Sequence, residues 1–235
     1  QRAINGIKIA IEQIGLQEGH EIAMGHTVSS ANRIAYTMKE PIGVVAAISA
    51  FNHPFNLAVH QVIPAIAVGC PVIIRPATQT PMSAIKLVEI LKEAGLPNGW
   101  AQAVVCDRNA GELLVTSPKP AFFTFIGSGP VGWYLNSKSS PGTRSALEHG
   151  GVAPVIVEPD ADIEAMIPDL VKGGFYHAGQ VCVSVQRIFV HESIANTVAS
   201  KIAEKASKLV VGNQLDPKTE VGPLINHNEV NRVEE

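Results

Sequence analysis

The chain has 235 residues, of which 46% are apolar and 17% are charged, and its formal net charge is −3. This composition supports a packed core and excludes an intrinsically disordered chain. The small acidic excess and the absence of a run of Lys and Arg argue against a nucleic-acid binder.

The cysteines also exclude classes of protein. Cys70, Cys106 and Cys182 are widely separated and form no CxxC pair and no Cys/His ligand pattern. Such a sparse, odd set fits a reducing compartment such as the cytoplasm, and neither a disulfide scaffold nor a metal site. No stretch of about 18 apolar residues predicts a membrane span. The first residues carry no initiator Met or signal peptide, and both ends read as parts of a longer chain.

The first forty residues predict a helix and then a hairpin. Isoleucines recur at spacings of three and four along residues 2–15, at Ile4, Ile7, Ile11 and Ile14. This spacing places them on one face of an amphipathic helix. Residues 26–38 are rich in Thr, Val and Tyr and are broken at Ser29 and Ser30, which predicts two short strands.

From residue 42 onward, short apolar runs alternate with helical segments. Strands are expected at 42–48, 71–75, 103–106, 121–126, 155–157 and 186–190. Helices are expected at 54–68, 82–94, 109–116, 128–137, 162–175 and 194–210. Apolar strands alternating with helices are typical of a parallel sheet covered by helices, so the chain is predicted to be α/β.

Four places in this pattern could carry chemistry. Gly127 and Ser128 follow a buried strand and open a helix, where backbone N–H groups can bind a phosphate. The spacing is not GxGxxG, and alone it is better explained as an ordinary strand–helix turn. Asn52 lies just beyond another buried strand, where its amide could donate to an oxyanion, although Asn is also common in turns before proline.

Cys182 and Glu148 are the candidate nucleophile and base. Cys182 follows a segment of small and polar residues (GGFYHAGQV), as an accessible reactive thiol requires. A buried structural cysteine is the alternative, and it suits Cys70 and Cys106 better. Glu148 precedes two glycines that would leave room for a water molecule, although it could equally be an ordinary loop residue.

Taken together and in order, these motifs resemble the aldehyde dehydrogenase superfamily along nearly the whole chain. The matching segments are 40–48, 93–99 (EAGLPNG), 127–128, 148–151 (EHGG), 160–162, 179–182 (GQVC) and 221–225. The resemblance implies a Rossmann-like cofactor domain at 1–23 and 41–152, with an oligomerisation hairpin at 24–40. It also implies the first part of a catalytic domain at 153–235, in a homodimer or homotetramer that uses NAD or NADP. Members of the family are nearly twice as long, and their later E-x-F-G-P segment is absent here.

The resemblance assigns roles to these residues. Cys182 would attack a small aldehyde, and the Asn52 side chain and the Cys182 backbone N–H would stabilise the oxyanion. After hydride transfer, Glu148 would activate the water that hydrolyses the thioester. The residues implied to contact the cofactor are Ser49, Phe51, Arg75, Ala77, Thr78, Gly127, Ser128, Val131 and Gly150.

Two departures from the family pattern suggest specificity. Where the family usually has Lys-Pro-Ser/Ala-Glu, this chain has Arg75-Pro76-Ala77-Thr78, which predicts that NADP is at least tolerated. His53, Asn56 and His60 share one helix face that is usually apolar or aromatic in the family, which predicts a polar or anionic substrate. Simple exposure to solvent is the alternative. A metal shared by the two histidines is not expected, because two helical turns separate them by about 10 Å.

Two alternative functions remain open from the sequence. A CoA-acylating relative is disfavoured because such enzymes often lack the residue that corresponds to Glu148. A non-catalytic nucleotide-binding relative is disfavoured because Cys182, Glu148 and Asn52 are all present.

Overall fold

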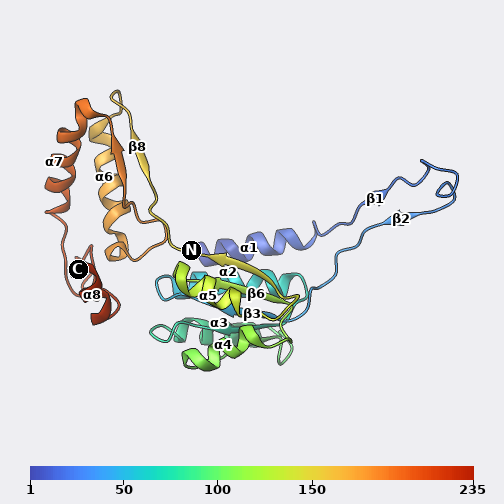
Figure 1. The fold of residues 1–235 in the computed structure, drawn as a ribbon. Helices are drawn as coiled ribbons and strands as arrows, with labels where there is room; N and C mark the ends of the chain where they lie inside the picture. The colour runs from blue at the N-terminus through green and yellow to red at the C-terminus, as the bar shows by residue number, and fades with distance from the viewer. The chain divides into compact units, whose positions relative to one another are not determined.

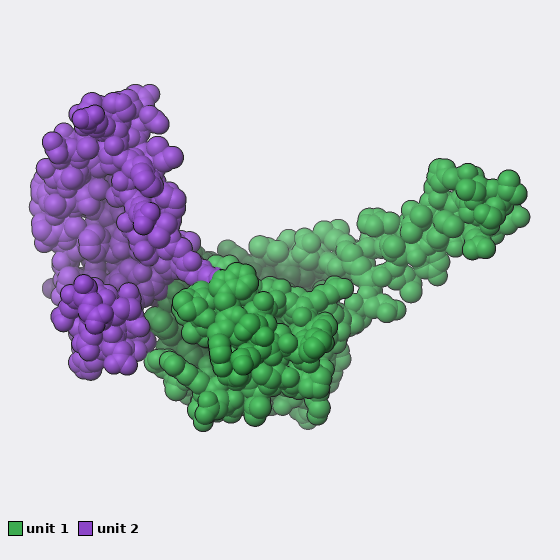
Figure 2. Space-filling view, viewed as in Figure 1, with its two compact units in different colours: residues 1–148 green, residues 149–235 purple.

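The computed structural model describes residues 1–235 and divides into two compact units, residues 1–148 and 149–235 (Figure 2). Both units combine helices with parallel strands, as the sequence predicts. No helix in the chain is long and apolar enough to cross a membrane.

A five-stranded parallel sheet forms the centre of the first unit (Figure 1). Its strands, in chain order, are β3 (Val45–Ile48), β4 (Val72–Arg75), β5 (Ala101–Ala103), β6 (Phe122–Ile126) and β7 (Arg144–Glu148). Their order across the sheet is β5-β4-β3-β6-β7, and every neighbouring pair is parallel. All four residues of β3 are buried, which explains why this segment reads as an unbroken apolar run.

Helices cover both faces of this sheet. Successive side chains of β3 point to opposite faces, and each face packs against its own set of helices. The helices are α1 (Arg2–Ile14), α2 (Pro54–Ala67), α3 (Met82–Glu93), α4 (Arg108–Thr116) and α5 (Gly129–Ser137). Val45 and Ala47 belong to a core shared with α1, α2 and α3. Ala46 and Ile48 belong to a second core shared with α4 and α5. The two-residue period of a strand therefore divides the apolar residues between two layers of helices.

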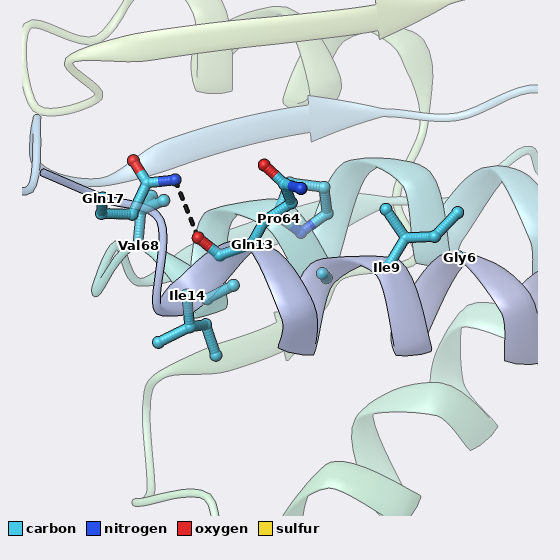
Figure 3. Close-up of a pocket in the computed structure, with 9 residues that line it drawn as sticks. Gly6, Ile9, Gln13, Ile14, Gln17, Pro64 and Val68 are labelled. Atoms are coloured by element: carbon cyan, nitrogen blue, oxygen red, sulfur yellow. Dashed lines mark hydrogen bonds between the residues drawn. The ribbon is translucent and has the colours of Figure 1, made fainter.

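An apolar groove of about 300 Å³ lies between α1 and α2 (Figure 3). Its lining includes Ile9 and Ile14 from α1, and Pro64 and Val68 from the C-terminal end of α2. Asn56, a predicted substrate residue, lies in the first turn of α2 and is not part of this lining. His53 and His60, the other predicted substrate residues, are also absent from the lining.

The predicted hairpin exists, but its first strand lies earlier than expected. β1 (Glu21–Ile22) pairs antiparallel with β2 (Ala35–Tyr36). The residues between 26 and 34 form turns and no strand. Thr27 and Ser30 explain this, because the Ser30 hydroxyl accepts the Thr27 N–H at 3.2 Å and the Thr27 carbonyl accepts the Ser30 N–H at 3.1 Å. Local side-chain bonds of this kind compete with strand pairing.

The second unit has a smaller sheet, in which β8 (Val155–Val157) and β9 (Ile188–Val190) pair in parallel. Its helices are α6 (Ile163–Phe175), α7 (Ala195–Ala206) and α8 (His227–Glu234), with short 3-10 turns η1 (Tyr176–Gly179) and η2 (Glu192–Ile194). Ile167, Val171 and Val198 form the buried core between α6 and α7. The expected helix at 194–210 ends four residues early, at Ala206.

Two strands differ from the sequence prediction. The strand expected at 103–106 occupies 101–103, so Cys106 lies in the connection that follows β5. β7 was not predicted, because most of its residues are exposed and polar and show no alternating apolar pattern. Its backbone pairs with β6 at the sheet edge, and backbone pairing leaves no signature in side-chain hydropathy.

Candidate active site

One edge of the five-stranded sheet gathers most of the predicted site residues. Arg75 ends β4, Ser49 follows β3, Gly127 follows β6 and Glu148 ends β7. Because all five strands are parallel, their carboxyl ends lie at the same edge. Chain order reverses between β3 and β6, and ligands of open α/β sheets bind outside the strand ends at such a point.

The turn after β6 is built to leave backbone donors available. Ser128 is the N-cap of α5 but makes no side-chain capping bond, and a proline lies in the first turn of the helix. The first N–H groups of such a helix point outward and favour an anion. Gly127 is required here, because a Cβ at this position would lie 2.6 Å from Phe125 Cζ. This turn fits the pyrophosphate of a dinucleotide.

The same turn lies beside Glu148. The Gly127 N–H donates to the Glu148 carbonyl at 3.0 Å, and Ile126 is paired with Glu148 in the sheet register. The Glu148 side chain is exposed at the end of β7. Glu148 is therefore a strand-end residue and not a loop residue, and the sheet fixes its backbone next to the proposed phosphate turn.

Arg75 is held at the end of β4 in a specific conformation. Its Nη2 donates to the Cys106 carbonyl at 3.1 Å, and its Nε is buried without a hydrogen-bond partner. A Cβ at Gly111 in α4 would lie 2.6 Å from Arg75 Cδ, so glycine is needed for the arginine stem to lie there. Thr78, three residues later, is exposed and uncharged. Position 78, where the family usually has Glu, therefore carries no carboxylate.

Asn52 lies between β3 and α2, and its Oδ1 accepts the His53 N–H at 3.1 Å. An amide group also carries N–H donors, the kind of group that oxyanion stabilisation requires.

The polar face at the start of α2 is not uniform. His53 and Asn56 are half-buried, and Asn56 Oδ1 is buried without a hydrogen-bond partner. His60 is exposed and lies near Gly6 of α1, where a Cβ would be 3.9 Å from its ring. A buried amide oxygen without a donor is costly unless a ligand or water supplies one. Asn56 is thus the strongest candidate among the three.

A buried glutamine, Gln61 of α2, was missed by the sequence analysis. Its Nε2 donates to the carbonyls of Ile48 and Thr124, each at 3.2 Å. These carbonyls belong to β3 and β6, so one side chain ties the two strands between which the chain order reverses. The signal was available, since the residues one helical turn away on either side are apolar (Leu57, Ala58, Pro64 and Ala65) and a glutamine among such residues is uncommon.

Cys182 is in the second unit and is the exposed cysteine of the chain, whereas Cys70 is buried and Cys106 is intermediate. Before it, His177, Ala178 and Gly179 adopt φ values of 53°, 55° and 74°. A left-handed conformation costs each non-glycine residue roughly 1–2 kcal/mol. Such strain is concentrated at functional sites. Gly151 lies near this segment, since its Cβ would be 3.7 Å from the Cys182 carbonyl oxygen.

The sequence model of the aldehyde dehydrogenase family matches residues 1–235, and the chain belongs to that family. This confirms the resemblance seen in the motifs. The chain is 43% identical to a 3-sulfolactaldehyde dehydrogenase of Priestia megaterium, over 100% of this chain and 49% of that protein. It is 41% identical to a lactaldehyde dehydrogenase of Methanococcus vannielii, over 89% of this chain and 46% of that protein.

The fold agrees with solved structures of the family. The glyceraldehyde-3-phosphate dehydrogenase GapN from Methanocaldococcus jannaschii, complexed with NADP, matches with a TM-score of 0.91 and 37% identity. The match covers 99% of this chain and 51% of that one. The chain therefore spans about half the length of the relatives it matches.

Proposed function

We propose that this chain serves the NAD(P)-dependent oxidation of an aldehyde to a carboxylic acid, with Cys182 as the nucleophile. The observation that carries the proposal is the exposed thiol of Cys182, placed directly after a left-handed turn in a chain whose other two cysteines are less accessible. Membership of the aldehyde dehydrogenase family supports the same chemistry.

The residues at the sheet edge fit a dinucleotide. The Gly127–Ser128 turn and the uncapped start of α5 would bind the pyrophosphate, and the exposed Val131 would contact the adenine. Ser49, Phe51, Ala77 and Gly150 would complete the contacts predicted from the family pattern. When bound, NAD or NADP supplies the acceptor for the hydride that leaves the substrate.

The chain's own residues then account for the remaining steps. The Cys182 thiolate attacks the carbonyl carbon and forms a thiohemiacetal, while the Asn52 amide and the Cys182 backbone N–H donate to its oxygen. Loss of the hydride leaves a thioester. The Glu148 carboxylate takes a proton from water, which attacks the thioester and releases the carboxylic acid and the thiolate.

The substrate is proposed to be a small polar or anionic aldehyde. Asn56 supports a polar substrate that carries a hydrogen-bond donor, because its buried Oδ1 has no donor within the chain. Two relatives are named for lactaldehyde and 3-sulfolactaldehyde, which are both small and polar. His53 adds a second half-buried polar group to the first turn of this helix.

NADP is proposed to be accepted together with NAD. Arg75 retains a cation at the end of β4, and the uncharged Thr78 removes the carboxylate that would repel a 2′-phosphate. A relative of known structure was solved with NADP, which supports this reading.

Assembly through the hairpin is proposed as well. Val28, Ile34, Tyr36 and Met38 are all exposed, and the first of these is 99% exposed. Apolar side chains gathered in this way mark an interaction surface. A homodimer or homotetramer formed through residues 24–40 would cover them.

The proposal is tested with the full-length protein. A panel of polar, anionic and aliphatic aldehydes is assayed with NAD and with NADP, and the products are identified with and without CoA. We expect free acid as the product and preference for polar aldehydes. A CoA thioester as the product would favour the CoA-acylating alternative, which the presence of Glu148 disfavours.

Thiol labelling of the same full-length protein tests whether it is an enzyme or a non-catalytic relative. Cys182 is alkylated with iodoacetamide and detected in its peptide by mass spectrometry. We expect a bound aldehyde together with cofactor to protect this thiol. Equal labelling with and without these ligands, and no NADPH formation with any aldehyde, would contradict the proposed function.

A further inference from the structure

Side-chain hydrogen bonds hold the segment that carries Cys182 in place within the second unit, on both sides of the cysteine. On the C-terminal side, the buried Ser184 donates through its hydroxyl to the Gly174 carbonyl of α6 at 3.2 Å. On the N-terminal side, the side-chain amide of Gln180 makes the hydrogen bonds that hold the segment. Cys182 itself lies between these two residues and is exposed.

Gln180 connects two segments that are far apart in the sequence. Its Nε2 donates to the His177 carbonyl at 3.0 Å and to the Pro223 carbonyl at 3.4 Å. Its Oε1 accepts the Ile225 N–H at 2.9 Å. One amide therefore joins the left-handed turn before Cys182 to the backbone at 223–225.

This arrangement suits the amide group of glutamine. Two of the three partners are carbonyl oxygens, which can only accept, and the third is an N–H, which can only donate. A carboxylate could bind the N–H but would face two carbonyl oxygens without a proton to donate. An apolar side chain of equal length could satisfy none of the three.

The turn that Gln180 binds is one that the local sequence does not favour. His177 and Ala178 are not glycines, yet both have positive φ angles. Such conformations persist only where the surroundings hold them. The Gln180 backbone N–H also donates to the His177 carbonyl at 3.1 Å, so the side chain and backbone of one residue close the same turn.

We propose that Gln180 is a positioning residue for the nucleophile, because its amide holds the 177–179 turn against residues 223–225 and thereby fixes the approach of the Cys182 thiol. The inference rests on the proposed role of Cys182. It adds a function for residues 221–225, which the sequence analysis noted only as part of the family resemblance.

The test uses two substitutions of similar length in the full-length protein. Gln180→Met removes both halves of the bridge, and Gln180→Glu keeps the acceptor for Ile225 but removes both donated bonds. The matched control is Gln102→Met, because Gln102 Nε2 donates to the Gly99 carbonyl three residues earlier at 3.2 Å, as Gln180 does to His177. Gln102 lies in β5, in the other unit.

Three quantities are measured for each protein: kcat and KM for the aldehyde and cofactor, the pH profile of Cys182 alkylation, and the unfolding midpoint. Values of kcat are normalised to the amount of folded protein, measured by circular dichroism at the assay temperature. We expect kcat to fall about tenfold or more in both Gln180 variants, since small displacements of a reacting group have large effects on rate. The cofactor KM should stay within about twofold, because the cofactor contacts are not altered.

The alkylation profile measures the charge effect that Gln180→Glu adds to the loss of the bridge. In this variant the negative charge two residues from the thiol should move the profile to higher pH, whereas Gln180→Met should not shift it in this way. Gln102→Met should match the wild type in all three measurements. If Gln180→Met does not fold, Gln180→Glu decides the question, with kcat compared at a pH where its alkylation profile has reached a plateau.

Two results have distinct meanings. Wild-type kcat in folded Gln180 variants, with or without a lower unfolding midpoint, would overturn the positioning role and leave the function of Cys182 intact. Full activity of a Cys182→Ala protein would instead overturn the proposed function on which the inference rests.

Discussion

The two units of the chain use parallel strands in different ways. In the first, β3 has two neighbours and helices on both faces, and all of its residues are buried. In the second, β8 and β9 pair with each other, and Ile156 and Phe189 remain 74% and 56% exposed. The first unit thus encloses its own core, while the second presents apolar side chains on its surface. The enclosed sheet carries the residues proposed to bind the cofactor, and the less enclosed unit carries Cys182, the proposed nucleophile.

The largest expected difference between the units is chemical. Cys182→Ala should lower aldehyde oxidation by more than about a thousandfold, as loss of a covalent nucleophile does in other enzymes. Cys106→Ser, in the first unit, should retain nearly full activity, because only its backbone carbonyl has a contact that the site uses. The measurement is the initial rate of NADPH formation by purified protein. Similar losses in both variants would remove the distinction between the cysteines.

The cores should respond unequally to truncation. Phe123 is fully buried between helices and sheet, so Phe123→Ala should lower the free energy of unfolding by about 3–5 kcal/mol. Phe189→Ala, in the second unit, should lower it by less than about 1 kcal/mol, because the ring is already largely in solvent. Urea titration followed by circular dichroism measures both values. An equal effect would mean that the Phe189 face is covered in the folded protein.

A smaller change tests the cofactor edge of the first unit. Thr78→Glu places a carboxylate near Arg75 and should weaken NADPH binding about tenfold while changing NADH binding little. The dissociation constants are obtained from the fluorescence of the reduced cofactors. Gln102→Glu adds the same charge to an exposed position in β5 and should affect neither cofactor. Equal weakening of both cofactors by Thr78→Glu would show that the 2′-phosphate does not lie there.

The smallest effect is expected from pH in the second unit. Desolvation lowers the pKa of His177 below its ordinary range. The unfolded chain therefore takes up this proton more readily, so stability falls as pH drops through about 6.5 and is unaffected above it. Thermal unfolding at pH 5.5 and 7.5 measures this dependence. His177→Asn, which tolerates a positive φ, should reduce it, and an unchanged pH dependence would count against the assignment.

Much of the fold could be predicted because apolar patterns record burial. The strands at 45–48, 72–75 and 122–126 and the helices between them follow directly from such patterns. β7 could not be predicted, since backbone hydrogen bonds hold it and its side chains are mostly exposed. The first strand of the hairpin was misplaced because its turn is set by hydroxyl contacts between Thr27 and Ser30.

The site residues divide in the same way, into those that a sequence pattern indicates and those that depend on contacts between distant segments. Asn52, Gly127 and Glu148 were predicted as site residues because each follows or ends a strand or lies in a recognisable motif, and the parallel sheet brings these strand ends to one edge. The roles of Gln61 and Gln180 could not be predicted, because they depend on backbone groups from distant parts of the sequence. The sequence shows Gln61 as unusual on an apolar helix face and includes Gln180 in the GQVC motif, but neither pattern shows which groups the glutamine binds.

The place of β7 at the end of the sheet has a consequence for motion. Its only neighbour in the sheet is β6, whereas the central β3 is paired on both sides. Edge strands open locally at a lower free energy than central ones, so the amide protons of β7 should exchange with solvent sooner than those of β3. In the proposed function, Glu148, the carboxylate proposed to activate water, would therefore lie on a strand of the sheet that is expected to open more easily than the central strands.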